Sequence, residues 1–133
     1  MSKILVIADQ KKNKIRKSTF EALCEGRRLC DSLGAELECA ILGTAVSGLV
    51  DQLASYGADR VYFIENPIFE NYLNPAWIQA LKAIIEKSSP RLVLTPTCES
   101  SKDFMPGLVA AVDGCGIMDC SNLSWEGDKI VVD

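Results

Sequence analysis

The sequence predicts an α/β fold in which a mainly parallel sheet is covered by helices on both faces. Two observations carry this prediction: short apolar runs of strand length alternate with amphipathic stretches, and the connections between successive strands are long enough to hold a helix. A third observation concerns the end of the chain. Two short strand-like runs separated by Gly127 and Asp128 predict a C-terminal β-hairpin.

The first strand is expected over Ile4–Ala8, and because it is apolar on both faces it is predicted to be a central parallel strand. The connection over residues 9–17 carries five basic side chains, and we interpret it as a solvated loop, with a docking patch as the alternative. A capping-box pair, Ser18 and Glu21, predicts the start of a helix that ends at Gly34.

The next segments complete two strand–helix units. Alternating polar and apolar residues over Glu36–Leu42 predict a half-exposed strand near the edge of the sheet. We expect Thr44 or Ser47 to cap a second helix that stops near Gly57. The following strand is expected over Arg60–Ile64.

The second half of the chain continues this alternation up to the hairpin. A third helix is expected over Trp77–Ile85, with Pro90 after its end. Leu92–Thr95 reads as the fourth strand, 96–102 as a loop and Leu108–Val112 as part of a fourth helix.

Composition indicates one globular domain. The chain has 133 residues, 48% of them hydrophobic and 24% charged, and a domain of this size buries about two thirds of the surface of its unfolded form. Its 14 basic and 18 acidic side chains give a formal charge of -4, which provides no general attraction to nucleic acid or to anionic membranes. The first apolar run is too short for membrane insertion, and we expect a cytoplasmic protein.

Histidine is absent from the sequence, and this excludes histidine-based catalytic triads, two-histidine metal motifs and imidazole pH switches. No two of the six cysteines have the two-residue spacing of a zinc ribbon or a thioredoxin-type motif. We therefore assign neither catalytic residues nor metal ligands.

A ligand of an open α/β sheet binds at the carboxyl ends of the strands. The chain has neither a Gly-x-Gly-x-x-Gly fingerprint nor a P-loop, so the candidates for a nucleotide pocket are polar residues and one glycine at those ends. They are Asp9, Gly43, Thr97, Ser100 and Ser101. The Asp9 carboxylate can accept a hydrogen bond from a ribose hydroxyl. The hydroxyls of the loop over residues 96–102 can bind a phosphate. Ordinary loop and helix-capping roles are the alternative for Asp9 and for the hydroxyl residues.

Five segments together resemble the amino-terminal domain of the electron-transfer flavoprotein alpha subunit, and the resemblance covers nearly the whole chain. The most specific ones are the Tyr-Gly-Ala-Asp-x-Val-Tyr run and the Asp-x-x-Pro-x-x-x-Ala-Ala start of a helix. The segments are Ile4–Asp9, Thr19–Leu23, Tyr56–Tyr62, Lys102–Ala111 and Gly116–Leu123.

The resemblance implies a Rossmann-like, adenine nucleotide alpha hydrolase-like fold, with residues 1–133 as the N-terminal domain. It also implies a heterodimer with a beta subunit that takes electrons from dehydrogenases and passes them to acceptor proteins through FAD. The flavin lies in a C-terminal domain absent from this chain, so we expect a scaffolding and subunit-docking domain that is not an enzyme and binds no FAD alone. A stand-alone adenine-nucleotide-binding module of the same fold is the alternative.

Overall fold

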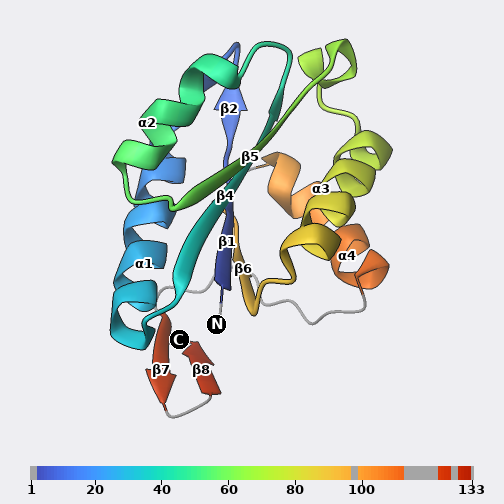
Figure 1. Cartoon of the computed structure of the whole chain (residues 1–133). Coiled ribbons are helices and arrows are strands. Elements are labelled where there is room, and N and C mark those ends of the chain that lie inside the picture. The colour runs from blue at the N-terminus through green and yellow to red at the C-terminus, as the bar shows by residue number, and fades with distance from the viewer. Residues whose placement is uncertain (1–2, 97–98, 113–122, 127–128, 133) are drawn as a thin grey trace.

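The computed structural model describes residues 3–96, 99–112, 123–126 and 129–132. Its centre is a four-stranded sheet in which all neighbouring strands are parallel, in the order β5-β4-β1-β6 (Figure 1). The strands are β1 (Lys3–Ile7), β4 (Glu36–Gly43), β5 (Arg60–Glu65) and β6 (Leu92–Leu94). Because β1 lies between β4 and β6, the prediction of a central parallel first strand is confirmed.

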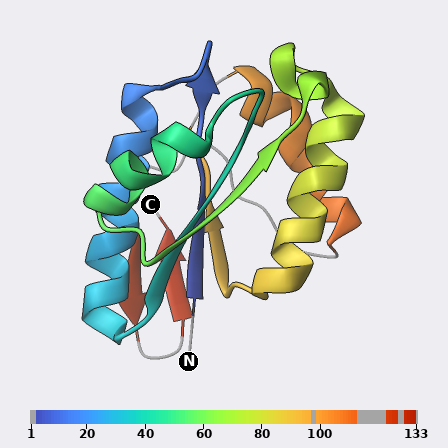
Figure 2. The ribbon, with the colours of Figure 1, turned by 45° about the horizontal axis from the view of Figure 1, so that its top comes forward.

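Helices cover both faces of this sheet, with α1 and α2 on one side and α3 and α4 on the other (Figure 2). Their bounds are α1 (Lys17–Leu33), α2 (Val50–Ser55), α3 (Asn74–Ser88) and α4 (Glu99–Ala111), with short 3₁₀ turns η1 (Ser47–Leu49) and η2 (Pro67–Glu70). The predicted α/β class and Rossmann-like layering are confirmed.

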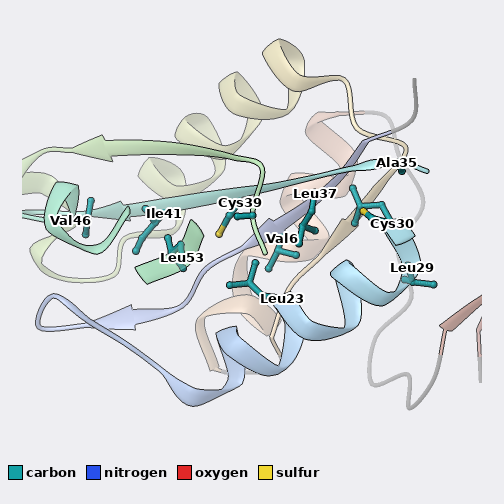
Figure 3. Packing of buried hydrophobic residues seen from close by; sticks show 12 residues of the cluster. Val6, Leu23, Leu29, Cys30, Ala35, Leu37, Cys39, Ile41, Val46 and Leu53 are labelled. Carbon is teal, nitrogen blue, oxygen red and sulfur yellow. The ribbon is translucent and has the colours of Figure 1, made fainter. Parts of the chain in front are cut away.

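Two apolar clusters hold the layers together. On one face, Leu23 and Cys30 of α1 lie beside Val6 and Leu37 of the sheet (Figure 3), and Leu29 of α1 belongs to the same buried cluster. The cluster on the other face joins side chains of β1 and β4 to η2, α3 and α4; its buried members are Leu5, Ile7, Ala40, Leu42, Phe69, Leu81, Ile84, Phe104 and Leu108. Burial on both faces explains why the central strands consist mainly of apolar residues.

The connection over residues 9–17, expected to be a solvated loop, contains a small antiparallel hairpin, and its basic side chains are exposed. The hairpin consists of β2 (Gln10–Lys11) and β3 (Lys14–Ile15). The two turn residues, Lys12 and Asn13, have φ angles of 53° and 61°, which is the left-handed geometry that a two-residue hairpin turn of this type requires.

This hairpin also changes the start of α1. The amide of Arg16 donates to the carbonyl of Asp9 over 2.9 Å, which fixes Arg16 in an extended conformation directly before the helix. Arg16 is therefore the N-cap residue and makes no side-chain capping bond, so the predicted capping box of Ser18 and Glu21 is wrong. The predicted end at Gly34 is confirmed, because Gly34 has the left-handed φ of 70°.

Three further boundaries differ from the predictions. Strand β4 pairs on both sides and is buried from Leu37 onward, so it is internal and not a half-exposed strand near the edge. Helix α3 begins at Asn74 because Pro75 fits the first turn of a helix, where no intrahelical amide donor is needed. Helix α4 begins at Glu99 and continues through Pro106, so most of the expected loop after β6 is helical.

The predicted C-terminal hairpin is confirmed. Strands β7 (Leu123–Glu126) and β8 (Lys129–Val132) pair antiparallel, and β7 lies beside α1 (Figure 1). The expected turn at Gly127 and Asp128 lies outside the described residues. Within the described ranges, no helix combines the length and the apolar character that crossing a bilayer requires.

Candidate functional site at the carboxyl edge of the sheet

The topology brings the predicted nucleotide-pocket residues to one edge of the sheet. Asp9 follows β1 and Gly43 ends β4, while Ser100 and Ser101 lie in the first turn of α4, which follows β6. Because these three strands are parallel, their carboxyl ends share an edge. Thr97 lies outside the described residues.

Side chains of the chain itself fill the space beside Gly43. The Nε2 amide of Gln10 donates to the carbonyl of Leu42 over 2.9 Å, and a Cβ added to Gly43 would meet both the Val46 side chain and that same amide. Gly43 therefore makes room for Gln10 and Val46, and no open cradle for a phosphate lies beside it.

The hairpin turn closes the same crevice from outside. The Oδ1 atom of Asn13 lies 3.3 Å from both the Thr44 hydroxyl and the Ala45 amide, which donate to it. The Asn13 amide in turn donates to Oε1 of Gln10 over 2.9 Å. These bonds hold β2 and β3 over the end of β4.

Asp9 is fixed in place by the start of α1. The Thr19 hydroxyl is fully buried, accepts from the Asp9 amide over 2.7 Å and donates to the Asp9 carbonyl over 2.9 Å. The Asp9 carboxylate lies 3.4 Å from Nε of Arg16. These contacts give Asp9 a local structural role in joining β1, the hairpin and α1.

Ser101 is also engaged within the fold. Its side chain is buried, and its hydroxyl donates to the carbonyl of Pro96 over 2.8 Å. Ser100 is half-buried in the same turn of α4. The Ser101 bond ties the start of α4 back to the segment after β6.

The side chains at this edge determine whether FAD or another adenine nucleotide can fit there. A nucleotide phosphate needs backbone amides or hydroxyls that face open space. Between β1 and β4 that space is occupied by Gln10 and Val46, and the Ser101 hydroxyl donates inward. The described residues at this edge therefore do not fit a nucleotide cofactor between β1 and β4.

Cys30 and Cys39 are fully buried thiols in the described part of the chain. Burial raises the pKa of the Cys30 thiol to about 11 and that of Cys39 to about 12, so both thiols are protonated and poor nucleophiles at neutral pH. No group of three or more metal-ligating side chains was found among the described residues.

Sequence reasoning missed an acid inside the sheet, Glu38. It is fully buried on β4, where Ser88 of α3 donates its hydroxyl to Oε1 and the Tyr62 hydroxyl donates to Oε2 over 3.2 Å. Position 38 alternates with apolar residues of β4, a pattern that predicts exposure to solvent. A signal was present in Ala40 and Leu42, which share its face and are apolar.

A second missed feature is a polar link between α1 and the segment before β5. The Nη1 atom of Arg27 donates to the Gly57 carbonyl over 2.9 Å and to the Asp59 carboxylate over 3.1 Å. Asp59 also accepts from the Leu37 amide over 2.9 Å. We call these four residues the Arg27 clasp; it holds α1, β4 and the start of β5 together.

The Arg27 clasp gives stability a defined pH dependence. The Leu37 amide, followed by Arg27, holds the pKa of Asp59 below its ordinary value. A carboxyl group with a lowered pKa in the folded state stabilises the fold above its unfolded pKa of about 3.9. That contribution is lost as the pH falls through the lower, folded pKa.

We expect Asp59→Asn to lower the free energy of unfolding by about 1 kcal/mol at neutral pH, since the side chain is half exposed.

Urea unfolding at neutral pH and at successively lower pH checks this expectation. The difference between the parent protein and Asp59→Asn should shrink as the pH falls below about 4. Asp51→Asn removes one exposed carboxylate from α2 and serves as the matched control. A difference that stays constant over this pH range, or an equal effect of the control, would contradict the role of Asp59.

A patch of exposed apolar side chains lies between β5 and α3. Ile68 and Leu73 are each 49% exposed and Tyr72 is 38% exposed, and we call these three residues the apolar patch. The Tyr72 hydroxyl donates to Asp103 over 2.6 Å, and the Tyr72 ring lies 5.1 Å from that of Trp77. Part of the patch is therefore anchored to α3 and α4.

Comparison with known proteins identifies the family. A family model described as "Electron transfer flavoprotein domain" matches residues 4–133. The chain belongs to this family. The electron transfer flavoprotein domain thus accounts for nearly all of the sequence, including the Tyr56–Tyr62 segment, which contains two residues of the Arg27 clasp.

Similar proteins are named as electron-transfer subunits. The chain is 29% identical to electron transfer flavoprotein subunit alpha of Bacillus subtilis over 97% of its own length, and 29% identical to that of Megasphaera elsdenii over 95%. It is 28% identical to acryloyl-CoA reductase electron transfer subunit beta of Anaerotignum propionicum over 96%. The chain spans 39%, 37% and 35% of these three relatives, respectively.

Proposed function

We propose that this electron transfer flavoprotein domain is the scaffolding and subunit-docking part of an alpha-type subunit. In this proposal residues 1–133 form an N-terminal domain, and FAD is held by a separate domain. Electrons then pass from dehydrogenases to acceptor proteins through that flavin. The family membership and the names of the relatives support this assignment.

The observation that carries the proposal is the filled carboxyl edge. Gln10 and Val46 occupy the position beside Gly43 where a nucleotide would approach the backbone. A domain of this fold whose ligand crevice is closed by its own side chains is suited to support a cofactor domain. The chemistry of electron transfer belongs to the flavin itself, so the proposal gives this domain no catalytic step.

The apolar patch supplies a surface for docking the beta subunit. Exposed apolar residues cost free energy in water and stabilise a complex when a partner covers them. Tyr72 is anchored to Asp103, and Asn74, two residues further along the chain, donates to the same carboxylate over 2.9 Å. A rigid surface loses little conformational entropy on binding, which favours its use as an interface.

Charge placed in the apolar patch is expected to weaken the heterodimer. In the full-length alpha-type subunit co-expressed with its beta subunit, Ile68→Lys together with Leu73→Lys should lower the affinity at least about tenfold, because each lysine must be desolvated in the interface. Size-exclusion chromatography and FAD absorbance per heterodimer measure the outcome.

Gln52→Lys with Ser55→Lys adds the same charge on exposed positions of α2 and should leave the heterodimer intact. Equal assembly of both double variants would contradict docking through the apolar patch.

Calorimetric titration of the chain with AMP, ATP and FAD tests whether this domain is a scaffold that binds no nucleotide of its own. Micromolar binding would contradict it, with AMP or ATP binding supporting the stand-alone nucleotide module.

A further inference from the structure

The β2–β3 hairpin lies at the carboxyl edge of the sheet (Figure 1), and three of its residues are lysines. Lys11, Lys12 and Lys14 are exposed, and we call them the lysine tip. Among the described residues none of the three is joined to a carboxylate by an ion pair, whereas Arg16 at the base of the hairpin pairs with Asp9. The positive charge of the lysine tip is therefore directed to solvent.

The other residues of the hairpin fix its position. Gln10 bonds to the Leu42 carbonyl, and Asn13 accepts from Thr44 and Ala45. Ile15 packs against the apolar cluster beneath α1. The neutral side chains thus attach the hairpin to the fold, and the lysines are left as an ordered, outward-facing group.

Two features of the lysine tip oppose local stability. Lys12 has a φ of 53°, a conformation in which Asn or Gly is preferred and a residue with a longer side chain is strained. Lys11 and Lys14 are directly opposite in the ladder, where like charges repel. Residues that break local folding rules while remaining in an ordered element are enriched at functional surfaces.

The charge distribution indicates what kind of partner fits. Residues 9–17 hold five of the 14 basic side chains and one of the 18 acidic ones, so the rest of the chain has nine basic against 17 acidic side chains. A long polyanion such as nucleic acid, or an extended anionic bilayer, would be repelled by this acidic remainder. A local acidic group on another protein can contact the lysine tip alone.

We propose that the lysine tip is a docking surface for an acidic polypeptide, a cluster of Asp and Glu side chains presented by a partner protein. Complementary charge of this kind accelerates association and orients the partner. The inference rests on the hairpin alone and holds whether or not the apolar patch binds the beta subunit.

The test uses fluorescence anisotropy of a labelled short polyglutamate peptide, with a polyglutamine peptide of equal length as the uncharged probe. We expect the polyglutamate peptide to bind at low ionic strength and to be released as salt is added. The variant Lys11→Gln/Lys12→Asn/Lys14→Gln should bind at least about tenfold more weakly, because three charge pairs are removed together. Asparagine at position 12 suits the left-handed turn, so this variant is expected to fold.

Lys82→Gln/Lys87→Gln/Lys102→Gln removes the same charge from exposed positions on α3 and α4 and is the matched control. It should change the affinity less than about twofold, since these positions lie on other elements. An equal loss in both variants would overturn the proposal in favour of a net-charge effect. Tighter binding of single-stranded DNA or of phosphatidylserine vesicles than of polyglutamate would also overturn it, because the lysine tip would then serve a different class of partner.

Discussion

Replacing Glu38 with alanine is expected to lower the free energy of unfolding by about 3 kcal/mol. Glu38 is fully buried on the sheet face that α3 covers, and its two oxygens accept from Ser88 and Tyr62. Alanine leaves a cavity and deprives the buried Ser88 hydroxyl of its acceptor. Both effects act on the same contact between β4 and the end of α3, so the loss is large for one substitution.

Chemical denaturation of the parent protein, Glu38→Ala and Glu38→Gln measures this effect. Glutamine keeps the volume and one oxygen acceptor, so its cost should be about 1 kcal/mol. Equal stabilities of the alanine and glutamine variants would show that neither the cavity nor the hydroxyl acceptor matters. A parent protein less stable than both would show that the buried acid is a cost to the fold.

Glu38 also explains why the sequence pattern predicts a position near the edge of the sheet for β4. The alternation of Glu36, Leu37, Glu38 and Cys39 is the usual sign of a strand with one wet face. Burial of Glu38 depends on hydroxyls from Tyr62 and from Ser88, fifty positions further along the chain. Local patterning carries no information about such distant partners.

Elements determined by local chemistry were predicted more accurately. The apolar run of β1 and the left-handed Gly34 are recognisable within a few residues of sequence, and both predictions are confirmed. The start of α1 was missed because it depends on the bonds between Asp9, Arg16 and Thr19, which form only when the hairpin folds back.

The candidate site also combines features that local sequence predicts with features that depend on distant residues. Parallel topology alone predicts that Asp9, Gly43 and the residues after β6 share an edge, and the structure brings their described members there. The contents of that edge depend on Gln10, whose side chain lies beside Gly43. No spacing rule identifies a glutamine that fills a crevice. Side chains of Gln10 and Val46 fill the space beside Gly43. A nucleotide pocket that includes Thr97 remains a prediction.

The second large decrease in the free energy of unfolding is expected for Gly57→Ala, which changes the Arg27 clasp. Gly57 has a φ of 110°, which strains any residue with a Cβ, and an added Cβ would lie 2.8 Å from Cδ and 3.2 Å from Cγ of Arg27. The Arg27 side chain must then move and lose its bonds to Gly57 and Asp59. We expect a loss of about 3 kcal/mol in the free energy of unfolding.

Gly34→Ala separates backbone strain from loss of the clasp. Gly34 also has a positive φ, but an added Cβ there meets nothing within 4 Å, so its cost should be about 1 kcal/mol. The difference between the two variants, measured by urea unfolding, reports the contact with Arg27. In an Arg27→Ala background that difference should largely vanish, because the side chain that clashes is gone. If it persists there, the cost of Gly57→Ala is one of backbone conformation and the Tyr56–Tyr62 segment does not act through Arg27.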